Sequence, residues 1–213
     1  MDVLSTPAGT NRIYAASGLS INWRALYCVY AMRTLTFRQA TPDDIGDIVA
    51  LVNSCYRGDS SRVGWTTEAD LLDGTRTDEG EIQSLMSLKD SKILSCSSGR
   101  EIVGSVHIQK QGTACYLGML VVKPELQGGG VGRRLMNEAE TRARELWGST
   151  KMTMTVISLR DELIAYYERR GYRRTGQIKP FVADATHGIP RVGGIELEVL
   201  EKSLDNNSSI TET

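Results

Sequence analysis

Apolar and polar residues follow two different spacings in the stretch from Tyr116 to Trp147. Residues 117–122 form a short apolar run that Pro124 ends, because proline has no N–H for a strand ladder, and this run predicts a buried strand. Farther on, apolar side chains recur at three- and four-residue steps with Arg and Glu between them, which predicts an amphipathic helix lying on a sheet. The apolar positions of this helix are Val131, Leu135, Met136, Ala139, Ala143 and Leu146.

Upstream of this stretch, the pattern predicts strands and two helices. Residues 34–38 alternate apolar and polar side chains, as a half-buried strand does. A helix begins near Pro42 and runs to about Tyr56, because proline suits the first helical position and Asp43 and Asp44 lie at the positive end of the helix dipole. The other elements are a helix at 79–88 and strands at 92–97 and 102–109, which tight turns join to the central strand as an antiparallel meander.

Downstream, residues 151–156 form another strand, and a return through a helix makes it parallel to the central strand. A helix follows at 159–172, with Gly171 as its C-terminal stop. The end of the domain is predicted as a strand at 173–176, a loop at 177–194 and an alternating strand at 195–201. The fold class is therefore α/β of the α+β type, with a mixed, mostly antiparallel central sheet flanked by helices.

Composition narrows the function classes. The net charge is −1 and no apolar run has membrane-spanning length, so we expect no nucleic-acid and no membrane partner. Cys28, Cys55, Cys96 and Cys115 include no CxxC pair, and we interpret them as reduced thiols of a cytoplasmic protein rather than a disulfide framework or a zinc site. With only two histidines, we expect no metal.

Length predicts one domain with an extension at each end. Residues 1–31 are rich in Ser, Ala, Gly and Thr, and we interpret them as a disordered extension or as the product of a start placed upstream of a true beginning at Met32. Arg12 and Arg24 against the single acid Asp2 leave a mitochondrial presequence as a weaker alternative. The domain spans 32–204, and 205–213 is a polar, disordered tail.

A glycine-rich loop, Gln127 to Gly132, joins the central strand to its helix. Glycines allow positive φ and close approach of a ligand, and the first turn of a helix has unpartnered N–H groups at its positive dipole end. Such a loop is a site for phosphate or pyrophosphate, and Arg133 and Arg134 add positive charge. The loop fits neither a Walker loop, which needs Lys-Ser/Thr after its last glycine, nor the spacing of a dinucleotide fingerprint.

Gln127, Gly130 and Gly132 resemble the Gln/Arg-x-x-Gly-x-Gly/Ala motif of the GNAT acetyltransferase superfamily. The resemblance implies that the loop amides bind the pyrophosphate of acetyl-CoA. It also implies that the two parallel strands splay apart, so that the pantetheine arm pairs with the backbone near Leu120 and Val122. The residues implied for the cofactor are Leu120, Val121, Val122, Gln127, Gly128, Gly129, Gly130, Val131, Gly132 and Arg133.

The stretch Tyr167-Glu-Arg-Arg-Gly171-Tyr172 resembles the Tyr-x-x-x-Gly-Phe/Tyr ending of the same family, whose Tyr points at the thioester sulfur. Tyr167 is thus the candidate general acid, and a phenol of pKa about 10 can protonate a thiolate of pKa about 8.5. We assign Tyr166 to the core. Where the family often has Asn, this chain has Arg160, which we expect to reach a cofactor phosphate instead.

The acceptor side is predicted from residues 57–78, which are polar and turn-rich apart from a helical candidate at Thr67–Leu72 that Thr66 or Thr67 caps, with Asp70 at capping-box spacing from Thr67. We interpret this segment as a lid on the acceptor site, with a plain surface loop as the alternative. Carboxylates there suit an ammonium group. The acceptor residues predicted are Tyr56, Trp65, Glu68 and Asp70; the general base is left open between Tyr116 and His107, which would act through water, and His107 is more simply a strand residue.

The resemblance implies an acetyl-CoA-dependent N-acetyltransferase that transfers an acetyl group to a primary amine of a small molecule by direct attack in a ternary complex. The backbone N–H of Leu120 or Val122 would stabilise the oxyanion. Three alternatives stay open: a catalytically silent CoA-binding sensor or scaffold, a nucleotide-binding module, and a protein or peptide N-acetyltransferase. The resemblance also allows a homodimer.

Overall fold

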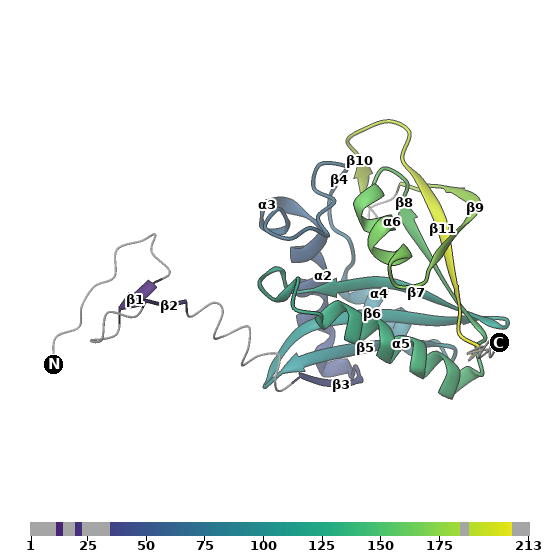
Figure 1. The fold of residues 1–213 in the computed structure, drawn as a ribbon, viewed down its shortest axis with the longest axis horizontal. Coiled ribbons are helices and arrows are strands. Elements are labelled where there is room, and N and C mark those ends of the chain that lie inside the picture. The colour runs from purple at the N-terminus through teal and green to yellow at the C-terminus, as the bar shows by residue number, and fades with distance from the viewer. Residues whose placement is uncertain (1–11, 15–19, 23–34, 184–187, 206–213) are drawn as a thin grey trace, which may run out of the picture.

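The structure, a computed structural model, describes residues 12–14, 20–22, 35–183 and 188–205 (Figure 1). Within the N-terminal extension, β1 (Arg12–Tyr14) and β2 (Ser20–Asn22) pair antiparallel. The disorder predicted for 1–31 and 205–213 otherwise falls outside the described residues. All the strands of the main sheet belong to the predicted domain.

Seven strands form this sheet in the order β3, β5, β6, β7, β8, β11, β9 (Figure 1). The central pair, β7 and β8, is parallel, and all other neighbours are antiparallel. This confirms the predicted mixed, mostly antiparallel α/β fold. The strands are β3 (Leu35–Gln39), β5 (Ser91–Ser98), β6 (Glu101–Gln111), β7 (Ala114–Val122), β8 (Lys151–Ile157), β9 (Arg173–Pro180) and β11 (Glu196–Ser203).

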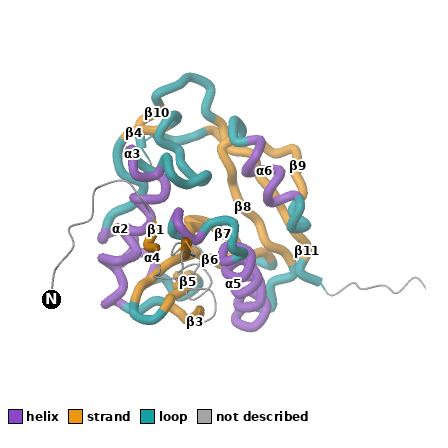
Figure 2. The backbone as a smooth tube through the Cα atoms, turned by 60° about the vertical axis from the view of Figure 1, so that its left-hand side comes forward, coloured by secondary structure: helices purple, strands orange, loops and turns teal. Residues whose placement is uncertain are grey.

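Helices cover both faces of the sheet (Figure 2). On one face α2 (Ile45–Tyr56) and α4 (Glu79–Ser87) pack on a core that includes Ile93, and on the other α5 (Val131–Trp147) and α6 (Asp161–Glu168) pack on a core that includes Leu94. Adjacent strand residues point to opposite faces, so β5 contributes to both cores. No helix in the described part of the chain is long and apolar enough to cross a membrane.

The central strand β7 is irregular at Met119. Met119 has φ of 45°, in the left-handed region, and Met119 and Leu120 together lie opposite the single residue Val106 of β6. Such a bulge bends the strand and leaves a backbone group out of the ladder. Pairing of β7 with β8 stops after Tyr116 and Thr153, so the two parallel strands separate from residue 117 on, and the bulge lies in the separated part of β7. The result is a gap at the centre of the sheet, where the facing edges of β7 and β8 do not pair with each other.

The segment 57–78 differs from its prediction. The helix predicted at Thr67–Leu72 is wrong: residues 67–71 lie in turns and irregular backbone, after α3 (Gly58–Ser61), and Leu72 begins the short strand β4 (Leu72–Asp73). The Thr67 hydroxyl accepts from Ala69 N–H, but the Thr67 carbonyl accepts from Arg160 at 2.6 Å, so a distant side chain holds the chain in a non-helical path. Tertiary contacts therefore override the capping signal.

The described parts of region 177–194, residues 177–183 and 188–194, contain strand residues where a loop was predicted. β9 continues to Pro180, and β10 (Ile189–Pro190) pairs with β4, tying the C-terminal loop to segment 57–78. Two short 3₁₀ helices complete the fold, η1 (Pro42–Asp44) before α2 and η2 (Pro124–Leu126) after β7. The helix start predicted at Pro42 is confirmed as the start of η1.

An ion pair fixes the entry into α2. Both terminal nitrogens of the Arg38 guanidinium donate to the Asp44 carboxylate, at 2.6 and 2.8 Å, and Thr41 N–H and hydroxyl donate to it as well. These contacts, above all the one with Arg38, lower the pKa of Asp44 from 3.8 to about 2. The folded state thus favours the ionised carboxylate.

We expect Asp44→Asn to lower the free energy of unfolding at pH 7 by about 1–2 kcal/mol, because Arg38 is nearly half exposed and solvent screens the pair. The folded pKa lies below the unfolded one, so this stability is present above about pH 4 and is lost as the pH falls to about 2. Urea unfolding of both proteins from pH 7 to pH 2 measures this. A difference that stays constant over that range would contradict the role of the ion pair.

Candidate active site

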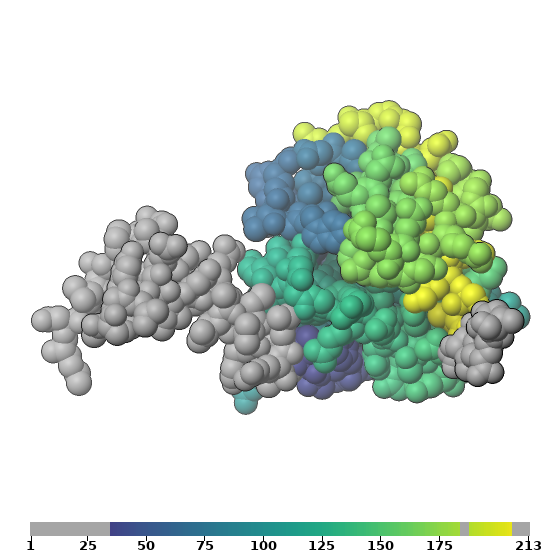
Figure 3. All heavy atoms as spheres, viewed as in Figure 1, coloured from purple at the N-terminus to yellow at the C-terminus, as the bar shows by residue number. Residues whose placement is uncertain are grey.

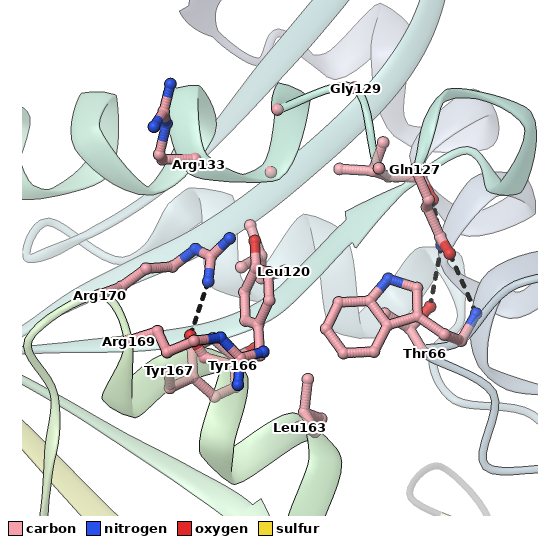
Figure 4. Close-up of a pocket in the computed structure, with 15 residues that line it drawn as sticks. Thr66, Leu120, Gln127, Gly129, Arg133, Leu163, Tyr166, Tyr167, Arg169 and Arg170 are labelled. Carbon is pink, nitrogen blue, oxygen red and sulfur yellow. Dashed lines mark hydrogen bonds between the residues drawn. The ribbon is translucent and has the colours of Figure 1, made fainter.

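A cleft of about 610 Å³ opens between the start of α5 and α6, and segment 57–78 closes its third side. Figure 3 shows the surface hollowed where these three parts of the chain meet, and Figure 4 shows the side chains inside. The cleft is lined by Trp65, Thr66, Leu120, Val122, Gln127, Gly128, Gly129, Gly130, Gly132, Arg133, Leu163, Tyr166, Tyr167, Arg169 and Arg170.

The start of α5 is built to accept an anion. Gly128 and Gly130 have φ of 79° and 85°, a conformation that costs glycine little, and Gly130 is the N-cap without a side-chain cap. The first turn of α5 contains no acidic residue. Its N–H groups and the positive end of the helix dipole therefore face the cleft beside three glycines, which fits the diphosphate of acetyl-CoA.

Tyr166 and two arginines form the wall opposite α5. Arg170 lies over the Tyr166 ring at 3.2 Å from its centroid and donates to the Tyr166 carbonyl at 2.7 Å. A Cβ added at Gly132 would lie 3.1 Å from the Tyr166 hydroxyl, so α5 and α6 approach closely at this glycine. Tyr166, predicted as core, packs on the core and also lines the cleft. Arg169 and Arg170 add positive charge that suits phosphates.

Gln127 has a structural contact where the resemblance implied a cofactor contact. Its amide nitrogen donates to the Val122 carbonyl at 2.9 Å, and its amide oxygen accepts from Trp65 N–H at 3.0 Å (Figure 4). It also reaches the Thr66 hydroxyl at 3.3 Å. Gln127 therefore ties segment 57–78 to the end of β7 and holds two walls of the cleft together.

Arg160 also has a different contact from the predicted cofactor phosphate. Its guanidinium donates to the carbonyls of Trp65 at 2.6 Å and Thr67 at 2.6 Å, and more weakly to that of Thr66. Arg160 thus holds segment 57–78 against the start of α6. It lines a second cavity and is not among the residues that line the larger cleft.

The second cavity, of about 250 Å³, occupies the gap between β7 and β8. It shares Leu120, Leu163 and Tyr167 with the larger cleft, so the two meet at the β7 bulge. Its walls carry both apolar and charged side chains. The residues that line it are Tyr56, Arg57, Glu68, Leu72, Arg76, Tyr116, Leu117, Gly118, Met119, Leu120, Met154, Thr155, Val156, Ile157, Arg160, Leu163, Tyr167, Phe181 and Leu197.

Tyr167 lies on the boundary between the two cavities. α6 presents it toward β7, with its ring edge-on to Tyr166 and Tyr172 at centroid distances of 5.3 and 6.0 Å. Burial, and then the neighbouring Tyr56, raises its pKa well above the ordinary value for tyrosine. The phenol is therefore protonated at neutral pH and can donate a proton there.

Charged groups of segment 57–78 and its neighbours enter the second cavity. Glu68 forms an ion pair with the buried Arg57. The Tyr56 hydroxyl donates to the Leu120 carbonyl at 3.2 Å, and burial raises the Tyr56 pKa. Arg76 lies 5.8 Å from the centroid of the Tyr56 ring. The cavity thus holds both signs of charge close to the bulge.

The two candidate bases differ in position. His107 is 5% exposed, contacts the Ser91 hydroxyl at 2.9 Å and lines neither cavity, and burial lowers its pKa to about 4. It is therefore uncharged at neutral pH and belongs to the strand core. Tyr116 lines the second cavity and its hydroxyl lies 3.2 Å from that of Thr155. Of the two, only Tyr116 lines a cavity.

Most of the predicted site residues gather at the two cavities. Trp65 lines the larger cleft, while Tyr56 and Glu68 line the second cavity. Three predicted residues line neither: Val121 and Val131 are buried in the cores, and Asp70 pairs with Arg62 at 2.6 Å on the surface. Sequence reasoning missed Thr66, Leu163, Arg169 and Arg170 in the cleft and Arg57 and Arg76 in the second cavity.

Three solved structures show the same fold. A ribosomal-protein-S18-alanine N-acetyltransferase from Escherichia coli is 13% identical, covers 84% of this chain and all of its own, and has a TM-score of 0.60. A putative phosphinothricin N-acetyltransferase is 17% identical over 81% of this chain and 99% of its own, with a TM-score of 0.59. A Vibrio cholerae spermidine N-acetyltransferase, solved with CoA and spermine, is 15% identical over 81% and 96%, with a TM-score of 0.58.

No curated protein matches the sequence. The profile of the family described as acetyltransferase (GNAT) domain matches residues 74–185, more than half of the chain. The matched region contains β7, the glycine loop, α5 and α6, which contribute to the lining of both cavities. The chain therefore belongs to the GNAT acetyltransferase family.

Proposed function

We propose that this protein transfers the acetyl group of acetyl-CoA to a primary amine of a small molecule by direct attack in a ternary complex. One observation carries the proposal: a large cleft with an anion-binding helix start and a small charged cavity meet at Leu120, Leu163 and Tyr167. A donor in the first and an acceptor in the second would bring their reacting groups together there.

Acetyl-CoA would supply the activated acetyl group as a thioester. The glycine loop and the first turn of α5 hold its diphosphate, and Arg169 and Arg170 add positive charge to the wall. The carbonyls of Leu120 and Val122 accept from Tyr56 and Gln127, which fixes the β7 edge at the gap. The N–H groups of these two residues then serve the pantetheine arm and the oxyanion.

Proton transfer falls to residues at the junction. Tyr167, kept protonated by its burial, donates to the departing thiolate. Glu68 lines the acceptor cavity and attracts the ammonium group of the incoming amine. The Tyr116 hydroxyl relays a proton of that group to water: its oxygen accepts the proton as its own O–H proton passes to a water molecule. The cavity volume of about 250 Å³ lies below the range for drug-sized ligands, which favours a small acceptor over a protein segment.

A thiol-release assay with acetyl-CoA and a library of amines tests the proposal. The library contains amino acids, polyamines, arylamines, aminoglycosides, and peptides with a free amino terminus or an internal lysine. We expect release of CoA with at least one small amine, and mass spectrometry should find the acetylated product. Turnover with peptides alone would contradict a small-molecule acceptor, and binding of acetyl-CoA without turnover would favour a silent CoA-binding domain.

A further inference from the structure

Arg76 is an uncommon feature of the acceptor cavity. Its side chain lines the cavity, and one terminal guanidinium nitrogen, Nη1, is buried without a hydrogen-bond partner. The backbone is well held, because Arg76 N–H donates to Asn53 Oδ1 at 2.7 Å. A buried donor on a charged group costs free energy unless a partner satisfies it. Arg76 thus presents an unmet donor to whatever binds in the cavity.

Two other arginines of the cavity have protein partners. Arg57 forms its ion pair with Glu68, and Arg160 donates to the three carbonyls of segment 65–67. Arg76 and Glu68 both lie near the Tyr56 hydroxyl, because the charges of both act on the pKa of Tyr56, in opposite directions. Both charges therefore lie near Tyr56 and within the same small cavity.

We infer that the acceptor carries a carboxylate, which Arg76 binds, so that the substrates are small amino acids or close analogues. This inference rests on the proposed acetyl transfer and names its acceptor class. An α-amino acid carries an ammonium group and a carboxylate on one carbon. The ammonium group suits Glu68, and the carboxylate suits the planar, multidentate guanidinium of Arg76.

Charge balance argues against a polycation. Three arginines and one glutamate line the cavity, so a polyamine would bring further positive charge into a site with an excess of it. The remaining lining is largely apolar, with Leu72, Met154 and Phe181 among it, and can cover an apolar side chain of the acceptor. A zwitterionic amino acid with an apolar side chain matches Arg76 with its carboxylate, Glu68 with its ammonium group and the apolar lining with its side chain.

Matched pairs of substrates test the inference on the wild-type protein. Each protein amino acid is compared with the amine formed by removing its carboxylate, for example phenylalanine with 2-phenylethylamine and leucine with isopentylamine, and spermidine is added. We expect kcat/KM for the best amino acid to exceed that of its decarboxylated partner at least about tenfold. Equal or better turnover of the decarboxylated amine or of spermidine would overturn the inference while leaving acetyl transfer intact. No turnover with any amine would overturn the proposed function as well.

Variants of Arg76 test whether this side chain causes the preference for amino acids over their decarboxylated amines. Arg76→Met keeps the length of the stem but removes the charge, and we expect the ratio of kcat/KM between acid and decarboxylated amine to fall at least about tenfold. Arg76→Lys should retain part of this ratio, because lysine keeps the positive charge but lacks the planar guanidinium that binds a carboxylate through two N–H groups. Arg142→Met is the matched control, an arginine on the outer side of α5 that pairs with Glu138 and lines neither cavity, and its ratio should equal that of the wild type.

Thermal unfolding of each variant separates recognition from stability. If Arg76→Met does not fold, Arg76→Lys and the wild-type pairs decide the question. A folded Arg76→Met protein that keeps the full preference for the carboxylated amine would overturn the role of Arg76.

Discussion

Replacing Tyr167 with phenylalanine is expected to lower kcat about 10²- to 10³-fold while changing the dissociation constant of acetyl-CoA by no more than about twofold. The substitution removes only the hydroxyl of a side chain that lines both cavities, and the ring keeps its contacts with Tyr166 and Tyr172. Without a proton donor, the thiolate would have to leave unprotonated. Steady-state thiol release and calorimetry with acetyl-CoA measure the two quantities.

Tyr172→Phe is the control for this prediction. Tyr172 belongs to the same aromatic cluster, but its hydroxyl donates to the buried Glu140 at 3.2 Å and it lines neither cavity. We expect this variant to lose stability, since a buried carboxylate loses a donor, and to keep kcat at a temperature where it is folded. An unchanged kcat in Tyr167→Phe would remove Tyr167 from the reaction, and equal losses in both variants would point to packing.

Replacing Gly132 with valine should raise the KM for acetyl-CoA at least about tenfold, with a folded protein. Even a single Cβ at this position would lie 3.1 Å from the Tyr166 hydroxyl and 3.6 Å from a Val122 methyl carbon. The two further methyl groups of valine would extend into the cleft between α5 and α6, beside the first-turn N–H groups. Thiol-release kinetics at varied acetyl-CoA concentration and thermal unfolding measure the effect.

Gly46→Val is a closely matched control. Gly46 is also the second residue of its helix, α2, and a Cβ there would meet no atom within 4 Å. Both variants carry the same β-branched cost in the first turn of a helix, so the difference between them isolates the cleft. If Gly46→Val raised the KM for acetyl-CoA as much as Gly132→Val does, the effect would come from the helix and the assignment of the cleft would be wrong.

Strong local signals made much of the fold predictable. The apolar run of β7 ended by Pro124, the three- and four-residue periodicity of α5 and the turns of the β5 to β7 meander all match the structure. Local signals failed where distant side chains decide the path. Thr67 and Asp70 have capping-box spacing, but Arg160 and Gln127 hold segment 57–78 in turns from outside it.

The bulge in β7 could not be predicted either. Met119 adopts a left-handed φ that few residues other than glycine take, and nothing in the run from Leu117 to Val122 indicates it. The surrounding sheet fixes this conformation, and the strain coincides with the junction of the two cavities. The sequence pattern therefore predicts the position of the strand, whereas the bulge at Met119 depends on the tertiary structure.

The cofactor side of the site was more predictable than the acceptor side. Gly128, Gly130 and Gly132 have a backbone role that spacing reveals, and Tyr167 follows from its position before Gly171. Arg169 and Arg170 were available as a basic pair in the same stretch. Arg76 stands in an irregular segment, where only the folded chain shows that its guanidinium enters a cavity. The acceptor recognition that we propose thus depends on a segment that carries no periodic signal.

Calorimetric titration of the wild-type protein with CoA, and in parallel with ATP and GTP, tests the central claim most directly. We expect one site for CoA with a dissociation constant on the order of 1–100 μM and no comparable binding of either nucleoside triphosphate. Binding of ATP or GTP without any heat from CoA would contradict it, because the glycine loop and α5 would then serve another ligand.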